Sequence, residues 1–445
     1  MLSERIKLKD DDKLPPITSW FAPLYHGEGD SIIRKKNDKP KKWKKQYPDY
    51  CFSYTGLQKI KENVNEKKSE LNPIGVNVHK HQKYVLIRNA CQLHEDLRGP
   101  NGIIAMQFNG EVVTNAWLKF YEICNEFLCP LLEKISRSKS KTLVSFHLAE
   151  APGNFILALN HFVKTKYPSV ILDWRASTYR NTYKSNVPHF GDKYGLIKKY
   201  PERWFYGADS DGDILSPANI RSFRSCVDQN TKVLLVTSDV KIILGQEGAK
   251  MKGSDDISDY DDEENINIPA HLGQLLASLN ILSKGGSMVL KILSLYESPT
   301  IAMIYLASHC FDKFYLCKPE SSRPANSEIY MIGVGYKGNI SSLQMDNLLN
   351  TMRYVRVLIS PKGSPSIFKK EDIPRSFVKK IIKINEMLAE SQIKNIDRNL
   401  RYFNKYKDSE LGELNKKCAT NRENTARLWI EKNNLELLRD EDKLL

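Results

Sequence analysis

The stretch HLGQLLASLNILSKGGSMVLKIL, His271 to Leu293, indicates the fold class of this chain. Its first half, His271–Leu282, has the apolar spacing of a helix, and the pair Gly285-Gly286 that follows suits a helix C-terminus. Its second half, Ser287–Leu293, is a short apolar run typical of a buried strand. A helix that leads directly into a buried strand is the repeating unit of a parallel sheet covered by helices on both faces.

The same alternation extends over residues 111–336 and predicts a Rossmann-like, doubly wound α/β sheet. The last two expected strands are joined by too few residues for a crossover helix, so we expect this pair to be antiparallel in a mostly parallel sheet. Further helices are expected at Val113–Ile135, Phe155–Lys164 and Ile301–His309. Further strands are expected at Thr142–Leu148, Val170–Trp174, Trp204–Gly207, Val233–Thr237, Lys313–Lys318 and Glu328–Gly335.

Two regions flank this predicted domain. Residues 1–110 form a basic N-terminal extension, and residues 337–445 form a lysine-rich helical appendage. The tract RKKNDKPKKWKKQYPDY, Arg34 to Tyr50, combines lysines that can contact phosphates with aromatic rings that can stack on unpaired bases. A flexible charged loop is the alternative interpretation. The acidic run DDISDYDDEE, Asp255 to Glu264, is expected to be a solvated loop, since contiguous acids rarely give the ligand geometry of a metal site.

The overall composition limits the class of protein. The net charge of +14 favours a polyanionic partner, with nucleic acid ahead of an anionic membrane, although solubility alone could also explain it. No apolar run is long enough for a membrane span, and the N-terminus lacks the apolar core of a secretory signal. The eight cysteines show no CxxC spacing. We therefore expect reduced thiols in a cytoplasmic compartment, without structural zinc and without a membrane association.

Four ionisable residues stand at positions that allow either an ordinary structural role or a role in ligand binding or catalysis. Asp239 ends the buried strand of TKVLLVTSDV, where α/β sheets bind ligands, or it simply caps the next segment. Lys291 lies inside the apolar strand SMVLKIL and needs a carboxylate partner unless that strand is at an edge. Lys119 in NAWLKFYE could be an ordinary solvent-facing helix residue, and Glu328 could be an exposed charge at the start of a strand.

A fifth segment, HLAEAPGNF from His147 to Phe155, joins an expected strand to an expected helix. A Pro-Gly turn at the carboxyl end of a strand lets a ligand approach the backbone closely. Many α/β proteins have such turns, so this signal is weak when taken alone.

Taken together, these segments resemble the FtsJ-like family of RNA ribose methyltransferases over about residues 111–336. KPESSRPANSEIYMIG is similar to the closing motif of the family and places its Glu at Glu328. GGSMVLKI resembles the Gly-Gly-strand-Lys motif and gives Lys291, while TSDV resembles the Ser-Asp motif and gives Asp239. TNAWLK resembles the leading helix and gives Lys119. The four motifs occur in the family order.

The resemblance implies S-adenosylmethionine as cofactor, and it implies no metal. Its mechanism has Lys291 as the base for a ribose hydroxyl, Lys119 lowering the pKa of that lysine, and Asp239 and Glu328 orienting both lysines. The donor turn departs from the family pattern, because His147 replaces the usual Asp and Asn154 replaces the second glycine. The expected cofactor-binding residues are Glu150, Ala151, Pro152, Gly153, Asn154, Phe155, Asp173, Asp213 (or less favourably Asp211) and Asp239.

The RNA substrate is left open between two kinds. The long flanking extensions and the VTNAWLK…SSRPANSE pattern are more similar to the cap-specific mRNA 2′-O-methyltransferases of large cytoplasmic DNA viruses than to the compact ribosomal RNA enzymes. This resemblance implies capped mRNA and the capping or transcription machinery as partners, in a host cytoplasm or a virion. A catalytically inactive RNA-binding subunit of a capping complex is the alternative from another class. An NAD-binding Rossmann protein is disfavoured, because GxGxxG is absent.

Overall fold

The computed structural model describes residues 2–7, 13–20, 47–180, 191–242, 263–357 and 365–445. Its centre is a seven-stranded sheet with the order β1-β6-β7-β5-β4-β2-β3. The basic tract from Arg34 to Lys45 and the acidic run from Asp255 to Asp262 lie outside the described residues. The strands are β1 (Leu2–Ile6), β2 (Thr142–Leu148), β3 (Ile171–Ala176), β4 (Val233–Ser238), β5 (Ser287–Leu293), β6 (Phe311–Lys318) and β7 (Glu328–Tyr336).

The sheet is mostly parallel, as predicted. Strands β2, β3, β4 and β5 pair in parallel, whereas β7 pairs antiparallel with both β5 and β6. The predicted antiparallel closing pair is therefore confirmed. The N-terminal strand β1, which the sequence pattern did not predict, pairs antiparallel with β6 at one edge.

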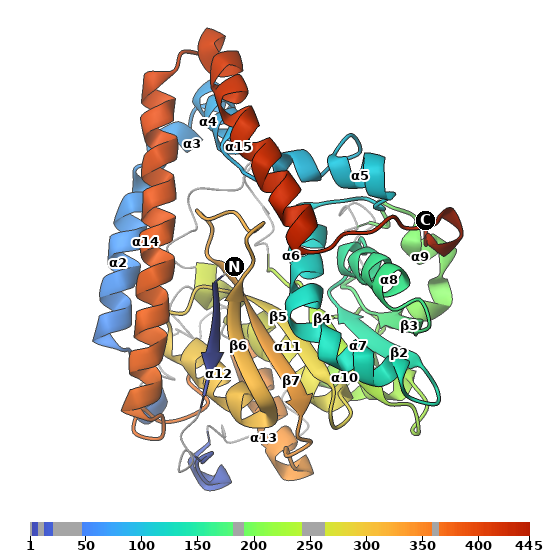
Figure 1. The fold of residues 1–445 in the computed structure, drawn as a ribbon. Helices are drawn as coiled ribbons and strands as arrows, with labels where there is room; N and C mark the ends of the chain where they lie inside the picture. The colour runs from blue at the N-terminus through green and yellow to red at the C-terminus, as the bar shows by residue number, and fades with distance from the viewer. Residues whose placement is uncertain (1, 8–12, 21–46, 181–190, 243–262, 358–364) are drawn as a thin grey trace.

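Helices cover both faces of the sheet (Figure 1). One face is covered by α11 (Glu263–Ile281), α12 (Ser298–Cys310), α10 (Pro217–Ser222) and α13 (Ser342–Val357). The other is covered by α6 (Asn115–Ile123), α7 (Cys129–Ser136) and α8 (Asn154–Lys166). Short helices α3 (Asn72–Gly75), α5 (Ile103–Phe108) and α9 (Leu196–Lys199) lie in the connections.

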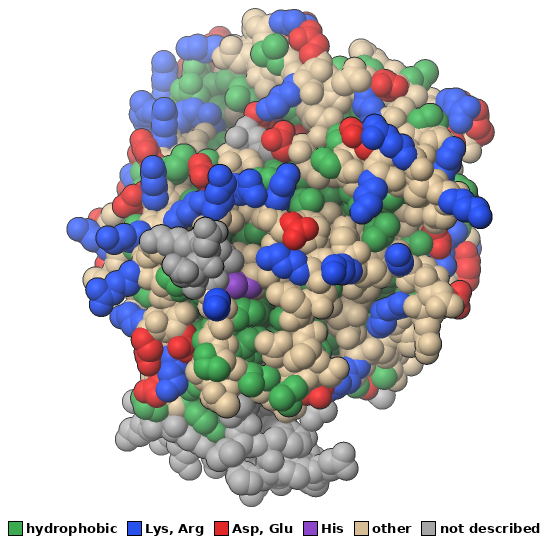
Figure 2. Space-filling model, turned by 60° about the horizontal axis from the view of Figure 1, so that its bottom comes forward, with side chains coloured by type: hydrophobic (Ala, Val, Ile, Leu, Met, Phe, Trp, Pro, Cys, Tyr) green, Lys and Arg blue, Asp and Glu red, His purple; other side chains and the backbone are tan. Residues whose placement is uncertain are grey.

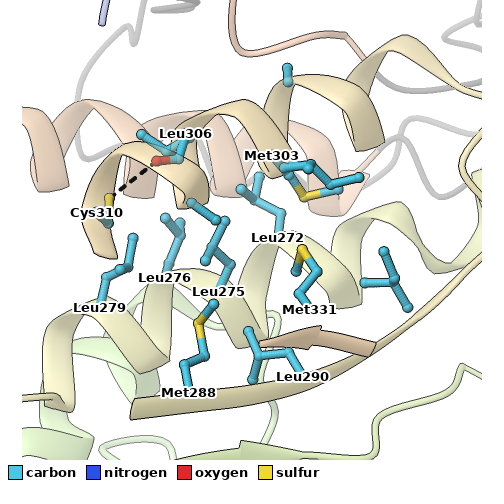
Figure 3. Packing of buried hydrophobic residues seen from close by; sticks show 14 of the residues in the cluster. Leu272, Leu275, Leu276, Leu279, Met288, Leu290, Met303, Leu306, Cys310 and Met331 are labelled. Atoms are coloured by element: carbon cyan, nitrogen blue, oxygen red, sulfur yellow. Dashed lines mark hydrogen bonds between the residues drawn. The ribbon is translucent and has the colours of Figure 1, made fainter. Parts of the chain in front are cut away.

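Strand β5 divides its side chains between these two layers, because successive residues of a strand point to opposite faces. Met288 and Leu290 pack in the cluster formed with α11 and α12, together with Met331 of β7 (Figure 3). Val289 packs instead in the cluster formed with α6 and α8. Lys291, two residues further along, shares the face of Val289.

Two predicted elements differ from the structure. The helix predicted at Val113–Ile135 is interrupted by a π-helical segment at Cys124–Leu128, which separates α6 from α7. Apolar spacing alone does not reveal a local change from i+4 to i+5 hydrogen bonding. The strand predicted at Trp204–Gly207 does not form. Trp204 makes a single parallel bridge with Ala176, and its ring packs against Trp174 instead.

The two flanking regions pack against each other beside the sheet (Figure 1). From the N-terminal region, α2 (Thr55–Ser69) contacts α14 (Arg375–Lys405), and α4 (Val78–Ala90) contacts both α14 and α15 (Leu411–Lys432). The last turns of α15 reach the α6 side of the domain, where Trp429 is buried against Tyr121. Lys and Arg side chains are distributed over the face shown in Figure 2, interspersed with acidic ones. Among the described residues, no helix is long and apolar enough to cross a membrane.

We expect the packing of α11 on the sheet to contribute several kcal/mol of stability. Leu276 is fully buried in this helix, and Leu276→Ala leaves a cavity while keeping good helix propensity. Chemical denaturation should show a loss of about 2–5 kcal/mol in the free energy of unfolding. The matched control is Leu343→Ala in α13, where the side chain is 62% exposed and the change should stay within about 0.5 kcal/mol. Equal effects of the two substitutions would contradict the assigned core.

Candidate active site

Lys291 and Glu328 reach the same face of the sheet from neighbouring antiparallel strands. In the β5–β7 register Lys291 lies opposite Tyr330, and Leu293 lies opposite Glu328. Tyr330 and Glu328 are two residues apart, so both point to the face that carries Lys291. This is the face covered by α6, the helix that carries Lys119.

Lys291 is buried and paired with Asp239. Its Nζ lies 2.7 Å from Oδ1 of Asp239 and donates a hydrogen bond of 2.9 Å to the backbone carbonyl of the same residue. Asp239 directly follows β4, the neighbour of β5, so the pair bridges two adjacent strand ends. Because β5 lies inside the sheet and Lys291 is only 7% exposed, the alternative of an edge lysine reaching water does not apply.

Lys119 and Glu328 form the second pair. Their Nζ and Oε1 atoms are 2.6 Å apart, and the hydroxyl of Tyr330 donates a 2.7 Å hydrogen bond to the same carboxylate oxygen. Thr114 caps α6 by accepting from the amide of Trp117, which fixes the start of the helix that carries Lys119. Lys119 is therefore buried toward the sheet rather than on a solvent-facing side of its helix.

The two carboxylates set the direction in which the pKa of Lys291 shifts. Burial lowers the pKa of Lys291, but the negative charges of Asp239 and Glu328 outweigh it, and the net direction is upward. Burial likewise raises the pKa of Glu328, yet Lys119 and Lys291 together hold it down at about 2. The net shift of the Lys291 pKa is therefore opposite to the lowering expected from Lys119, because the carboxylates are the stronger influence.

The predicted donor turn lies at the start of α8. Oε1 of Glu150 accepts hydrogen bonds from the amides of Phe155 (2.8 Å) and Ile156 (3.1 Å), so its carboxyl group caps the helix. Complete burial raises the pKa of Glu150 to about 8. Asn154 accepts a 2.9 Å hydrogen bond from the hydroxyl of Thr114 and thereby joins this turn to the start of α6. Gly153 adopts a φ of 114°, a conformation suited to glycine.

His147, which stands where the family usually has an Asp, belongs to the core. Its Nε2 hydrogen-bonds with Ser145 Oγ at 2.9 Å, and its Nδ1 with Thr237 Oγ1 at 2.7 Å. Burial lowers its pKa to about 3, which keeps the ring neutral. The imidazole thus cross-links β2 and β4, and its ring nitrogens are already used within the protein.

Three further acidic residues differ in their surroundings. Asp213 accepts from the amide of Leu215 in a turn, and Asp211 accepts from the amide of Asp213 and from the side chain of Asn219. Asp173 lies mid-strand, because β3 continues to Ala176 instead of ending at Trp174. Its carboxylate is paired with Arg175 and Arg203, so the geometry lends no support to a ribose contact.

The carboxyl ends of β3 and β4 hold polar atoms that suit a polar cofactor. The hydroxyls of Ser177, just after β3, and Ser238, the last residue of β4, are buried and lack a hydrogen-bond partner among the described residues. Unsatisfied buried hydroxyls are costly, so a ligand that supplies hydrogen bonds there would be favoured. Together with Asp239 they fit the polar groups of a nucleoside-type methyl donor.

Two further residues, which were not predicted from the sequence, hold the loop before Glu328. Nζ of Lys318 donates to the backbone carbonyls of Asn326 and Glu328 and to the side chain of Asn326, at 2.7–3.0 Å. Burial lowers its pKa to about 7. Glu122 of α6 accepts from the amides of Glu320 and Ser321 and from the indole of Trp429. The only signal for either residue was a charge in an apolar setting, the same signal that identified Lys291.

Comparison with known proteins assigns the chain to a family. The family model described as FtsJ-like methyltransferase matches residues 112–336, so the chain belongs to the FtsJ-like methyltransferase family. A probable methyltransferase of African swine fever virus (EP424R) is 31% identical over 61% of this chain and 59% of that protein. The cap-specific mRNA (nucleoside-2′-O-)-methyltransferase 2 of Danio rerio is 32% identical over 80% of this chain and 44% of that protein.

A third relative, the uncharacterized protein L511 of Acanthamoeba polyphaga mimivirus, is 34% identical over 70% of this chain and 36% of that protein. The chain thus spans between about a third and three fifths of the length of these relatives.

We expect Asp239→Asn to lower the pKa of Lys291, because it removes a carboxylate that opposes the effect of burial. An NMR titration of the lysine side chains should show the Lys291 signal moving to a lower pH. Asp173→Asn is the control, since this carboxylate contacts Arg175 and Arg203 and is not a partner of Lys291. An unchanged Lys291 titration in a folded Asp239→Asn protein would show that the pair does not set the charge of the lysine.

Proposed function

We propose that this chain is an S-adenosylmethionine-dependent RNA ribose 2′-O-methyltransferase that acts on the cap-proximal nucleotide of mRNA. The observation that carries the proposal is the pairing of two buried lysines with two carboxylates at the carboxyl edge of the sheet, Lys291 with Asp239 and Lys119 with Glu328. Membership in the FtsJ-like family supports methyl transfer as the reaction.

In this proposal the chain activates a ribose hydroxyl. S-adenosylmethionine, when bound, supplies a methyl group on a positively charged sulfur. Nζ of Lys291, in its neutral form, accepts the proton of the 2′-hydroxyl as the ribose oxygen attacks the methyl carbon in place of the sulfur. Asp239 orients Lys291 through two contacts to one ammonium, and Glu328 with Tyr330 orients Lys119. No step requires a metal.

The relatives and the flanking regions support the cap-proximal substrate. The Danio rerio relative is named for cap-specific mRNA methylation, and its similarity covers 80% of this chain, well beyond the family domain. The viral relatives favour a viral protein that works in the host cytoplasm or a virion beside a capping or transcription machinery. Ribosomal RNA remains the competing substrate. Methylation of capped but not uncapped transcripts of one sequence is the expected result, and equal methylation of both would contradict the cap assignment.

The pH profile of methyl transfer tests the role of Lys291. The carboxylates raise its pKa above the usual lysine value, so the neutral base is scarce near neutral pH and the rate should rise as pH increases toward that pKa. Lys291→Met keeps similar bulk without the base, and the rate should fall at least about a hundredfold while donor binding survives. Lys291→Arg should fail as well, since a guanidinium stays protonated.

Two outcomes would count against this role. A folded Lys291→Met protein that binds donor and RNA yet methylates capped RNA at the parental rate would exclude Lys291 as the base. Calorimetry that detects no S-adenosylmethionine binding by the folded parental chain would favour the alternative of a catalytically inactive RNA-binding subunit.

A further inference from the structure

A cavity of about 440 Å³ opens beside the two lysine–carboxylate pairs. Lys291 and Glu328 are among the residues that line it. Tyr84 and Arg88 of α4 and Arg398 of α14 line it as well. Both helices lie outside the part of the chain that matches the family, residues 112–336.

The described lining of this cavity has more basic than acidic side chains. Two of these described side chains are acidic, Glu263 and Glu328, and Glu263 is paired with Lys241. Six are basic: Lys68, Arg88, Lys241, Lys291, Arg323 and Arg398. Amide side chains from both flanking regions add further hydrogen-bonding groups. A pocket with this excess of cations and amides suits an anion rather than an apolar ligand.

Arg88 and Arg398 approach the same point from two helices. Burial raises the pKa of Tyr84, and the positive charges of Arg88 and Arg398 both act on that hydroxyl in the opposite direction. Among the described residues, no carboxylate forms an ion pair with Arg398, whose guanidinium donates to the amide oxygen of Asn399. Two guanidinium groups near one hydroxyl offer several N–H donors in the geometry that suits a phosphate.

The cavity shares some of the predicted site residues and not others. The donor-turn residues Glu150–Phe155 and Asp213 are absent from its described lining, whereas Lys291 and Glu328 are present. Lys291 therefore borders this cavity and also contacts Asp239, one of the predicted donor-binding residues. A group held in the cavity would lie beside the lysine that the acceptor hydroxyl must reach.

The flanking helices also hold the loop that leads to Glu328. Gln392 of α14 donates a 2.8 Å hydrogen bond to the carbonyl of Ala325, and Gln92, just after α4, donates to the carbonyl of Ser321. The cavity wall and the loop before Glu328 are thus tied together. The volume of the cavity, about 440 Å³, falls in the range of about 300–1,000 Å³ that is usual for ligand pockets. This is enough space for a nucleotide-sized group but not for a duplex.

We propose that this cavity binds the acceptor RNA as a single strand through its phosphates, and that α4 and α14 supply the phosphate contacts through Arg88 and Arg398. The inference rests on the proposed function and adds where the acceptor lies and which elements hold it. The helices outside the family domain thereby hold the RNA strand next to Lys291.

The test measures the binding of a short 5′-capped single-stranded RNA to the full chain at several salt concentrations. Each phosphate contact in single-stranded RNA contributes about 0.7 to the slope of log K against log salt. Arg88→Gln/Arg398→Gln should therefore flatten this slope by about 1.4 and weaken binding roughly 25-fold at 0.1 M salt. Binding of S-adenosylmethionine, whose expected residues lie elsewhere, should be unchanged in the double variant.

The matched control is Arg137→Gln/Arg427→Gln, which removes the same charge from two exposed arginines away from the cavity. It should leave the slope and the affinity close to those of the parental chain. If the cavity variant behaves like this control while the parental chain still methylates RNA, the cavity is not the RNA site and the proposed function stands. If the cavity variant loses RNA binding but the parental chain transfers no methyl group, the RNA site stands and the proposed function falls.

A measurement on the parental chain covers the case in which the double variant does not fold. RNA carrying 4-thiouridine next to the cap-proximal nucleotide should crosslink under ultraviolet light to peptides of α4 or α14. Crosslinks confined to other segments would overturn the proposal, and would leave an acidic peptide of a partner protein as the occupant of the cavity.

Discussion

The charge on Lys291 constrains much of this structure, because an ammonium at the end of a buried strand is tolerated only with carboxylates beside it. Those carboxylates come from elsewhere in the chain: Asp239 from the end of β4, and Glu328 from the start of β7. Glu328 in turn is shared with Lys119 of α6. Satisfying one charge therefore brings three strand ends and one helix to a single point. The contacts that allow Lys291 to be buried are therefore the same contacts that define the proposed active site.

A second set of buried polar contacts fixes the loop between β6 and β7 from several directions. Lys318 holds it from within through three hydrogen bonds, Glu122 holds its first amides from α6, and Gln392 holds Ala325 from α14. Because Glu122 also accepts from Trp429 of α15, the C-terminal helices are joined to the active-site side of the domain. The flanking helices are thus in direct contact with the segment that positions Glu328.

The sequence predicted those features that repeat or that cost energy when buried. Alternating apolar runs revealed the central strands, and Lys291 within an apolar run revealed the need for a partner. The short link before Glu328 revealed the antiparallel pair. Other features depend on contacts between distant segments and leave no local pattern. The pairing of β1 with β6, the π-helical segment at Cys124–Leu128 and the loss of the strand at Trp204 are of this kind. The upward shift of the Lys291 pKa also required the actual placement of both carboxylates.

The position of β1 has a consequence for how the domain can be isolated. Strand β6 would be the outermost strand if Leu2–Ile6 did not pair along it. Cutting the chain to the region shared with the family would uncover a row of backbone N–H and C=O groups on β6, which other chains can pair with. Such a fragment would be prone to edge-to-edge aggregation even with its catalytic residues intact. Leu2–Ile6 thus cover the edge of a sheet whose proposed active site lies at the ends of other strands.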